Sequence, residues 1–349
     1  MSSLVSPDWG ETLAEHFRAQ AAWGERLGSP FTAALLEGAA ANIDASGWVA
    51  RVMGGRDWVA ADAAPLRFAG ALHAAALQKR DAALVGAYTR FDAACALEAG
   101  ETFAARDPDF FASFLDYAPQ TNETRRAIGL LPAFLAVGAD GAPMHMLELG
   151  ASAGLNLNWD KFQYRTQSWR WRDEGPQIET DWRGAAPTLA PLTVASRAGC
   201  DIHPLDIFRP EEALRLRAYI WADQRERLAR FDAALALAQS ERTRVEQADA
   251  AAWLERRLGG ELQEGATVLY HSIVWQYFPK DIRARCRAAI EAGAARATPQ
   301  RRLAWVRFEH DRVLKQDGDG YSVDLQTWPG GERKLVARVD PHVRWVEAG

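Results

Sequence analysis

The spacing of apolar residues changes once along this chain, after Pro143. Before this point, apolar residues recur three and four positions apart, as on one face of a helix. After it, short apolar runs alternate with helical stretches of about a dozen residues, which is typical of βαβ units with parallel strands. We therefore predict an α/β protein with a helical domain over residues 1–140 and a sheet domain over residues 141–349.

Seven runs after Pro143 have the length and composition of strands. They cover residues 144–150, 194–201, 243–249, 266–274, 301–310, 321–328 and 332–340. We expect 144–150 to be a central strand of a mostly parallel sheet. The last two runs flank Pro329-Gly330-Gly331, which predicts an antiparallel C-terminal hairpin.

Helix boundaries can be predicted at several positions. Ser6-Pro7 is a favourable helix start because Pro suits the first helical position, and Thr121 is expected to cap a helix that ends near residue 137. In the sheet domain, we expect a helix from about Gly154 and one long helical run over 210–238.

Composition excludes several classes of protein. Lys and Arg number 41 against 46 Asp and Glu, giving a formal net charge of −5, which argues against bulk nucleic acid as a partner. No apolar run approaches the ~18 residues of a membrane span, and the amino end does not resemble a secretory signal. The 3 cysteines form no CxxC pair, so we expect no zinc site, no disulfide framework and a cytoplasmic location.

The strongest functional signal is the run LELGASAGLN at residues 147–156. Small residues between a strand and a helix let a ligand approach the backbone, and the helix amino end offers N–H donors. The glycine spacing fits the GxGxxG dinucleotide fingerprint poorly. Glu148, two positions before Gly150, would repel a pyrophosphate, but it could order the N–H groups of the loop or meet a cationic amine.

Acidic residues also end the next two predicted strands. Asp201 ends the run 194–201, and Asp249 ends the run 243–249. Ligands of open α/β sheets bind outside the carboxyl ends of the strands, where the carboxylate of Asp201 could accept both ribose hydroxyls. Each Asp by itself fits a helix cap, since Asp favours that position, and it is their joint occurrence at successive strand ends that favours a site.

The fourth predicted strand leads into YHSIVWQYFP, at the end of the sheet where ligands bind. The candidate residues for the reacting end of the site are His271, Ser272, Trp275, Gln276 and Tyr277. His271 could act as a general base because its side chain titrates near neutral pH. It could instead be a buried, hydrogen-bonded histidine among aromatic residues.

A polar cluster precedes the first strand. Gln120, Asn122 and Glu123 are candidate substrate contacts, although they also fit a polar helix start. We expect a Trp-rich insertion at about 162–190. The insertion and the residues just before it contain four tryptophans, Trp159, Trp169, Trp171 and Trp182. This insertion, expected to be a hairpin or flap, could form a lid that excludes water, or its tryptophans could pack the two domains together.

A serine hydrolase is a competing interpretation, because Gly150-Ala-Ser152-Ala-Gly154 fits the GxSxG nucleophile elbow. The acid and base of such a site would be Asp249 or Asp281 with His310 or His342. The elbow normally follows several strands, whereas this fragment follows the first one.

The order Glu-x-Gly-x-Ser-x-Gly resembles the first motif of Rossmann-like S-adenosylmethionine-dependent methyltransferases. Ser152 stands where that family usually has its middle glycine. The resemblance implies that Glu148 lies near the amino-acid end of the cofactor and that Asp249 meets the adenine amino group. The cofactor residues expected on this basis are Glu148, Gly150, Ser152, Gly154, Asn156, Asp201, Asp249 and His271.

Longer segments resemble one bacterial family, domain of unknown function 2332. The matching segments are QTNE, LELGASAGLNLNWDKFQY, GCDIHPLD, WADQRER and HSIVWQY. The resemblance covers most of the chain and implies a seven-stranded, Rossmann-like methyltransferase sheet behind a helical domain. We expect methyl transfer from S-adenosylmethionine to a small molecule. The alternative is a non-catalytic fold that binds a nucleoside-like ligand or a protein partner.

Overall fold

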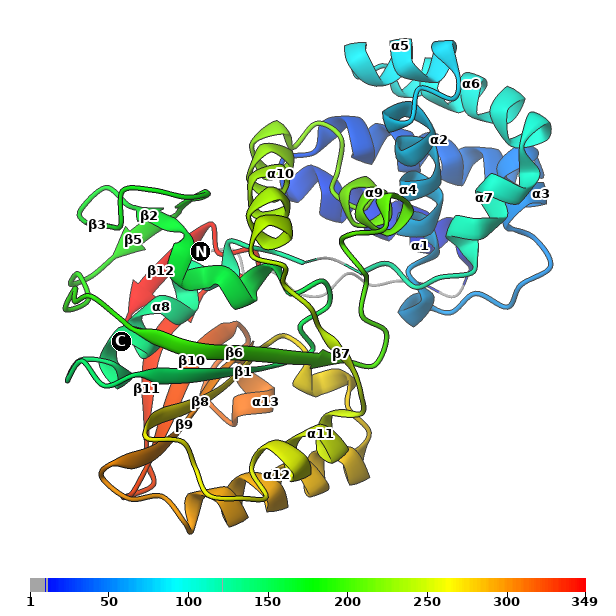
Figure 1. The fold of residues 1–349 in the computed structure, drawn as a ribbon. Coiled ribbons are helices and arrows are strands. Elements are labelled where there is room, and N and C mark those ends of the chain that lie inside the picture. The colour runs from blue at the N-terminus through cyan, green and yellow to red at the C-terminus, as the bar shows by residue number, and fades with distance from the viewer. Residues whose placement is uncertain (1–9, 11, 121) are drawn as a thin grey trace. The chain divides into compact units, whose positions relative to one another are not determined.

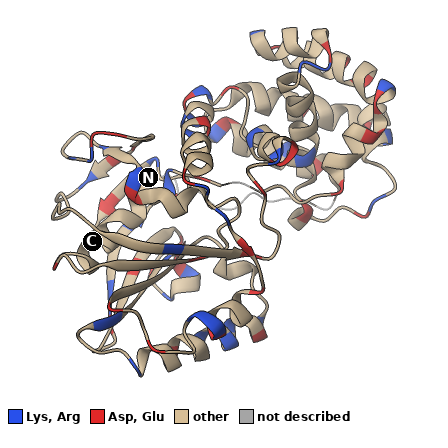
Figure 2. Cartoon of the chain, viewed as in Figure 1, with Lys and Arg blue, Asp and Glu red and all other residues tan. Residues whose placement is uncertain are grey.

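The computed structural model describes residues 10, 12–120 and 122–349, so the helix start predicted at Ser6-Pro7 and the cap predicted at Thr121 lie outside the described residues. The chain divides into two compact units. The helical unit contains the described residues up to 120 together with Phe208–Asp232, and the sheet unit contains Asn122–Ile207 and Ala233–Gly349. Lys and Arg are interspersed with Asp and Glu in both units (Figure 2).

The helical unit is built from short helices. They are α1 (Leu13–Arg26), α2 (Pro30–Asp44), α3 (Trp48–Met53), η1 (Ala60–Asp62), α4 (Ala64–Leu77), α5 (Ala82–Arg90), α6 (Ala93–Arg106), α7 (Pro108–Leu115), α9 (Pro210–Ala218) and the start of α10 (Arg225–Ser240). Side chains cap several of them: Thr12 and Glu15 form a capping box at α1, and Asp81 caps α5.

Close packing of aromatic rings against small residues forms the core of the helical unit. Phe17 and Trp48 both contact the ring of Phe68 on α4. On the same helix, a Cβ added to Gly70 would collide with the ring of Tyr219, so glycine is what lets the segment after α9 approach α4. The run predicted as one helix over 210–238 is two helices, α9 and α10. The chain turns between them, directly after α9, where Tyr219 is buried.

The sheet unit begins with a helix, and helices separate most of the strands of its parallel part (Figure 1). Its first elements are α8 (Arg126–Val137), β1 (Met144–Leu149), η2 (Leu155–Lys161), β2 (Gln163–Arg165), β3 (Arg170–Trp171), β4 (Gln177–Glu179), β5 (Asp181–Arg183) and β6 (Val194–Asp201). The end of α10 is followed by β7 (Glu246–Gln247), α11 (Ala250–Arg257), β8 (Gly265–Ser272), η3 (Trp275–Tyr277), α12 (Lys280–Ala294), β9 (Arg301–His310), α13 (Asp311–Leu314), β10 (Tyr321–Trp328), β11 (Glu332–Val339) and β12 (Trp345–Ala348).

The large sheet has the strand order β5-β12-β11-β10-β9-β8-β1-β6-β7. The strands from β9 to β7 are parallel, and β9, β10, β11 and β12 form an antiparallel meander. This confirms a mostly parallel sheet with antiparallel C-terminal strands, and β1 lies in its interior. The sheet has nine strands rather than the predicted seven, because the short β12 and β5 add to its edge.

The two faces of the large sheet are covered differently. Helix α8 lies on one face, where Phe134 contacts Tyr270, and α11 and α12 lie on the other (Figure 1). The helix predicted from Gly154 is the 3-10 segment η2, which is interrupted by non-helical backbone at Asn158. The predicted third strand shortens to the two residues of β7.

The Trp-rich insertion forms a second, three-stranded sheet in the order β3-β2-β4, while β5 pairs with β12. Trp159 lies between Phe134 and Trp171, with ring centroids 4.5 and 6.2 Å away. Trp169 packs edge-on against Trp182 at 4.9 Å. All four indoles are buried, so in this structure they serve as packing within the sheet unit.

Candidate functional site

A cavity of about 250 Å³ lies at the carboxyl ends of β1 and β6, between the starts of α11 and α12. We call it the strand-end crevice. Its lining residues are Gly150, Cys200, Asp201, Ile202, Asp249, Ala250, Val274, Tyr277, Phe278, Pro279 and Ile282. Four residues that the sequence singled out are thus brought together: Gly150, Asp201, Asp249 and Tyr277.

The turn after β1 has unusual backbone geometry. Gly150, Ser152 and Gly154 have φ values of +66°, +52° and +76°, in the left-handed region that favours glycine. A Cβ on Gly150 would collide with Val274, and one on Gly154 would collide with Val245. The close packing of Val274 on Gly150 and of Val245 on Gly154 thus requires glycine at both positions. Ser152 takes the left-handed conformation at a modest cost in strain.

Asp201 holds this turn in place. Its Oδ2 accepts a hydrogen bond from the backbone N–H of Ser152 at 2.9 Å, and its Oδ1 accepts one from the N–H of His203 at 2.9 Å. This is the loop-ordering task that the sequence suggested for Glu148. A carboxylate offers about four lone-pair sites, so Asp201 keeps acceptor capacity for a ligand.

Asp249 is the N-cap of α11. Its Oδ1 accepts the N–H of Ala252 at 3.0 Å, as the helix-cap interpretation predicts. The side chain also lines the strand-end crevice, so capping and ligand contact are compatible there.

Glu148 lies on the other face of the sheet, below α8. It is 3% exposed, and its Oε2 accepts a hydrogen bond from the Tyr270 hydroxyl at 3.1 Å. Burial raises the pKa of Glu148 to about 8, which the Tyr270 hydrogen bond opposes and the nearby Asp201 charge reinforces. Glu148 is therefore protonated in much of the population near neutral pH, and it is not among the residues that line the crevice.

The segment after β8 is strained and anchored by one buried acid. Ile273 has φ +53°, which is rare for a β-branched residue. The following two backbone N–H groups, of Val274 and Trp275, donate to Glu309 Oε1 at 2.9 and 3.0 Å. His271 Nδ1 lies 2.7 Å from the same oxygen. Strain supported by such a network is typical of functional segments.

The three predicted catalytic residues of this segment differ in burial and in position. His271 is fully buried, bonded to Glu309 and stacked on Trp275, which matches the buried-histidine interpretation. Gln276 is exposed. Tyr277 is 72% exposed and is the member of this group that lines the strand-end crevice.

The polar residues before α8 bind the turn after β1. Asn122 accepts the N–H of Leu155 at 2.9 Å and donates to the carbonyl of Ala151 at 3.3 Å. Asn156 Nδ2 donates to the carbonyl of Glu123 at 3.3 Å. Asn122, Glu123 and Asn156 thus form a support for the turn, and their roles toward a ligand stay predictions. Gln120 belongs to the helical unit.

Two of the partners considered for a hydrolase have other contacts. Asp249 caps α11, and His310 caps α13 while its Nε2 lies 3.5 Å from Asp319. The segment after Ser152 leads into a 3-10 helix rather than the α-helix of a nucleophile elbow.

Sequence reasoning missed a row of residues on β9. Trp305, Arg307 and Glu309 alternate along this strand and therefore point to the same face, away from α8. The alternation of polar and aromatic residues in a strand that is buried along most of its length was the available signal. These side chains line a second cavity, described below.

Comparison with known proteins identifies the family. The family described as "Uncharacterized protein conserved in bacteria (DUF2332)" matches residues 14–348. The chain belongs to this family. Searches of curated proteins and of solved structures found no match. Within the described part of the chain, no helix combines the length and the apolar character needed to cross a membrane.

Proposed function

We propose that this DUF2332 protein binds S-adenosylmethionine in the strand-end crevice and transfers its methyl group to a small molecule. The observation that carries the proposal is the meeting of Gly150, Asp201 and Asp249 in one cavity at the carboxyl ends of the parallel strands. In open α/β sheets, this is where ligands bind.

The chemistry of the crevice suits the nucleoside part of the cofactor. Ile202, Val274 and Phe278 give it apolar walls for a flat ring, and the two carboxylates can accept bonds from hydroxyl and amino groups. A volume of about 250 Å³ is near the lower end of ligand pockets, which suits a nucleoside better than a larger group.

When bound, the cofactor would supply an electrophilic methyl group. Displacement at a methyl group depends mainly on alignment of the reactants and exclusion of water, so a dedicated base is optional. The task of this chain would then be positioning: Asp201 holds the turn after β1, and Glu309 holds the segment that carries Val274. His271, Gln276 and Tyr277 stay predicted catalytic residues, and Tyr277 lines the crevice.

A second candidate function is ligand binding without group transfer. The enclosure of His271 against Glu309 favours it, because the side chain best suited to proton transfer is engaged elsewhere. The two candidates share the nucleoside site and differ in turnover.

Calorimetry with S-adenosylmethionine and with its demethylated product tests the binding site. Asp249→Asn is the most informative variant, because Asn is as good an N-cap as Asp. Besides the charged acceptor, it loses only a solvent-exposed ion pair with Arg285, whose Nη1 lies 3.8 Å from Oδ1. We expect unchanged unfolding and a Kd raised about tenfold or more, since a hydrogen bond to a charged group is worth roughly 1.5–3 kcal/mol. The exposed Asp57→Asn, in the helical unit, is the matched control.

The absence of binding to both compounds at millimolar concentration would contradict the proposal. Saturable binding with no methyl transfer across a panel of metabolites would support the second candidate instead.

A further inference from the structure

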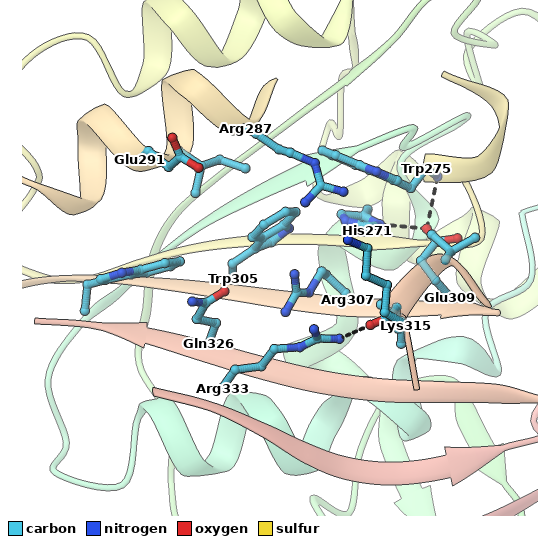
Figure 3. A pocket seen from close by; sticks show the side chains of 14 residues that line it. His271, Trp275, Arg287, Glu291, Trp305, Arg307, Glu309, Lys315, Gln326 and Arg333 are labelled. Carbon is cyan, nitrogen blue, oxygen red and sulfur yellow. Dashed lines mark hydrogen bonds and ion pairs between the residues drawn. The ribbon is translucent and has the colours of Figure 1, made fainter. Parts of the chain in front are cut away.

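A second cavity, of about 430 Å³, lies on the face of β9, β10 and β11 that points away from α8. We call it the arginine cavity. Its position follows from the topology, because the connection between β9 and β10 contains only the four-residue α13. Within the described residues, no long helix of this connection covers the face, and the neighbouring α12 covers only its edge. Figure 3 shows side chains from α12 and the three strands converging on the space.

The floor of the arginine cavity carries two arginines that share one buried acid. Arg307 Nε donates to Asp324 Oδ1 at 2.6 Å, and Arg333 Nε donates to Asp324 Oδ2 at 2.7 Å. Asp324 is fully buried, and its single charge faces two guanidinium groups. The floor therefore has an excess of positive charge.

Arg307 is only partly satisfied by this arrangement. It is 8% exposed, and its Nη2 has no hydrogen-bond partner among the described residues. Burial lowers the pKa of Arg307 although Asp324 opposes the shift, yet an arginine stays protonated. A buried donor without an acceptor is costly, so an anion that reached it would be stabilised.

The walls of the arginine cavity are flat aromatic rings. The indoles of Trp275 and Trp305 have centroids 5.4 Å apart, and Trp305 Nε1 is another buried donor without a partner in the described part of the chain. The guanidinium of Arg307 lies 4.2 Å from the Trp305 centroid, and that of Arg287 lies 5.4 Å from the Trp275 centroid. Stacking on the rings holds these donors in place before a ligand arrives.

The charge of the whole lining is positive. Arg287, Arg307, Lys315 and Arg333 line the cavity with Glu291 and Glu309. Of the two acids, Glu309 is bonded to His271 and to two backbone N–H groups. Arg287 and Lys315 are exposed at the rim, so an anion meets cations on entering (Figure 3).

We propose that the arginine cavity binds a small aromatic carboxylate. Its carboxylate would accept a hydrogen bond from Arg307 Nη2, the donor without a partner among the described residues, and its ring would lie against the indoles. Arg333, whose Nε and Nη2 donate to Asp324 and to the carbonyl of Leu314, would contribute its positive charge. This site is separate from the strand-end crevice, since the two sets of lining residues have no member in common.

Calorimetric titration of the full chain with benzoate tests the proposal. We expect saturable binding that is about tenfold tighter than binding of cyclohexanecarboxylate, which keeps the charge but lacks the flat ring. Benzyl alcohol, which keeps the ring without the charge, should give no saturable signal. Inorganic phosphate should bind more weakly than benzoate, because it cannot use the indoles.

Residues on the solvent side of α12 provide the variants: Arg287 and Glu291 are exposed, and Arg283 is half-buried. Arg287→Ala should weaken benzoate binding several-fold, whereas Arg283→Ala, one turn away and outside the lining, should not change it. Glu291→Gln should strengthen binding, because it removes a negative charge from the rim. Asp249→Asn, in the other cavity, should have no effect on benzoate.

Two results would overturn the proposal. One is no saturable benzoate binding at millimolar concentration. The other is equal affinity of the Arg287→Ala and Arg283→Ala variants, which would place the benzoate elsewhere. Equal binding of benzoate and cyclohexanecarboxylate would overturn the aromatic part of the assignment.

Discussion

The strand-end crevice and the arginine cavity lie in the same unit and have opposite chemistry. The crevice has mostly apolar walls and two acids, Asp201 and Asp249, whereas the cavity has indole walls and four cations. The crevice is formed by turns that follow parallel strands, and the cavity is formed by side chains of the strands themselves. One sheet can thus carry two sites, because parallel strands expose their ends and an incompletely covered meander exposes its face.

Glu309 connects the two regions. Its Oε1 accepts the N–H of Val274, which lines the crevice, and the N–H of Trp275, which lines the cavity. The segment 273–275 is thus common to both walls.

Glu309→Ala should break both regions at once. It removes the acceptor of three hydrogen bonds in a fully buried position and leaves two backbone N–H groups without it. Since each unsatisfied buried group costs roughly 1–3 kcal/mol, we expect a loss of about 3–5 kcal/mol in the free energy of unfolding, measured with urea. Glu291→Gln, at the exposed rim, is the control. A loss below about 1 kcal/mol would mean that the two walls are independent of Glu309.

Glu148→Gln should change how stability depends on pH. The folded pKa of about 8 exceeds the ordinary value of 4.5, so the folded state holds a proton that the unfolded state releases between these values. Wild-type stability should therefore fall relative to Glu148→Gln as pH rises from about 4.5 to about 8, and the difference should level off above that. The total is a few kcal/mol at most, at about 1.4 kcal/mol for each pKa unit.

Urea unfolding of both proteins at several pH values measures this difference. A constant difference from pH 5 to pH 9 would show that Glu148 titrates at its ordinary pKa.

Gly150→Ala should narrow the crevice and destabilise the sheet unit by roughly 1–3 kcal/mol, because it combines left-handed strain with a collision against Val274. Gly141→Ala is the matched control: its φ is +78°, but nothing lies within 4 Å of the added Cβ, so only about 1 kcal/mol of strain is expected. Adding Val274→Ala to Gly150→Ala should restore part of the loss. Equal losses of unfolding free energy in Gly150→Ala and Gly141→Ala would show that the Val274 side chain moves aside without destabilising the protein.

Benzoate affinity provides a further comparison for the same variants. Because Gly150 lines only the crevice, its substitution should leave the arginine cavity unchanged. A parallel loss of benzoate affinity would instead couple the two regions.

Much of the fold could be predicted from local patterns. The runs at residues 144–149 and 301–310 are strands because each carries an apolar pattern of the right length. The short edge strands β5 and β12 could not be placed in the same way, since so few residues carry too little periodicity. The strand predicted over 243–249 exists, but only as the two residues of β7. The helix expected after Gly154 became a 3-10 segment, where buried Asn156 and Asn158 make contacts outside the helix.

The candidate site likewise contains residues that the sequence identified and residues that only tertiary contacts brought together. Gly150 and Asp249 were identified because backbone turns and caps have local sequence signatures. The sequence alone thus determined where the strands end and which small or acidic residues follow them. Tertiary structure decided that Asp201, rather than Glu148, orders the turn and that Glu148 is buried against Tyr270. It also decided that Arg307 and Arg333 share Asp324. The pairing of strands places these charges together, and it joins residues whose separation along the chain carries no local signal.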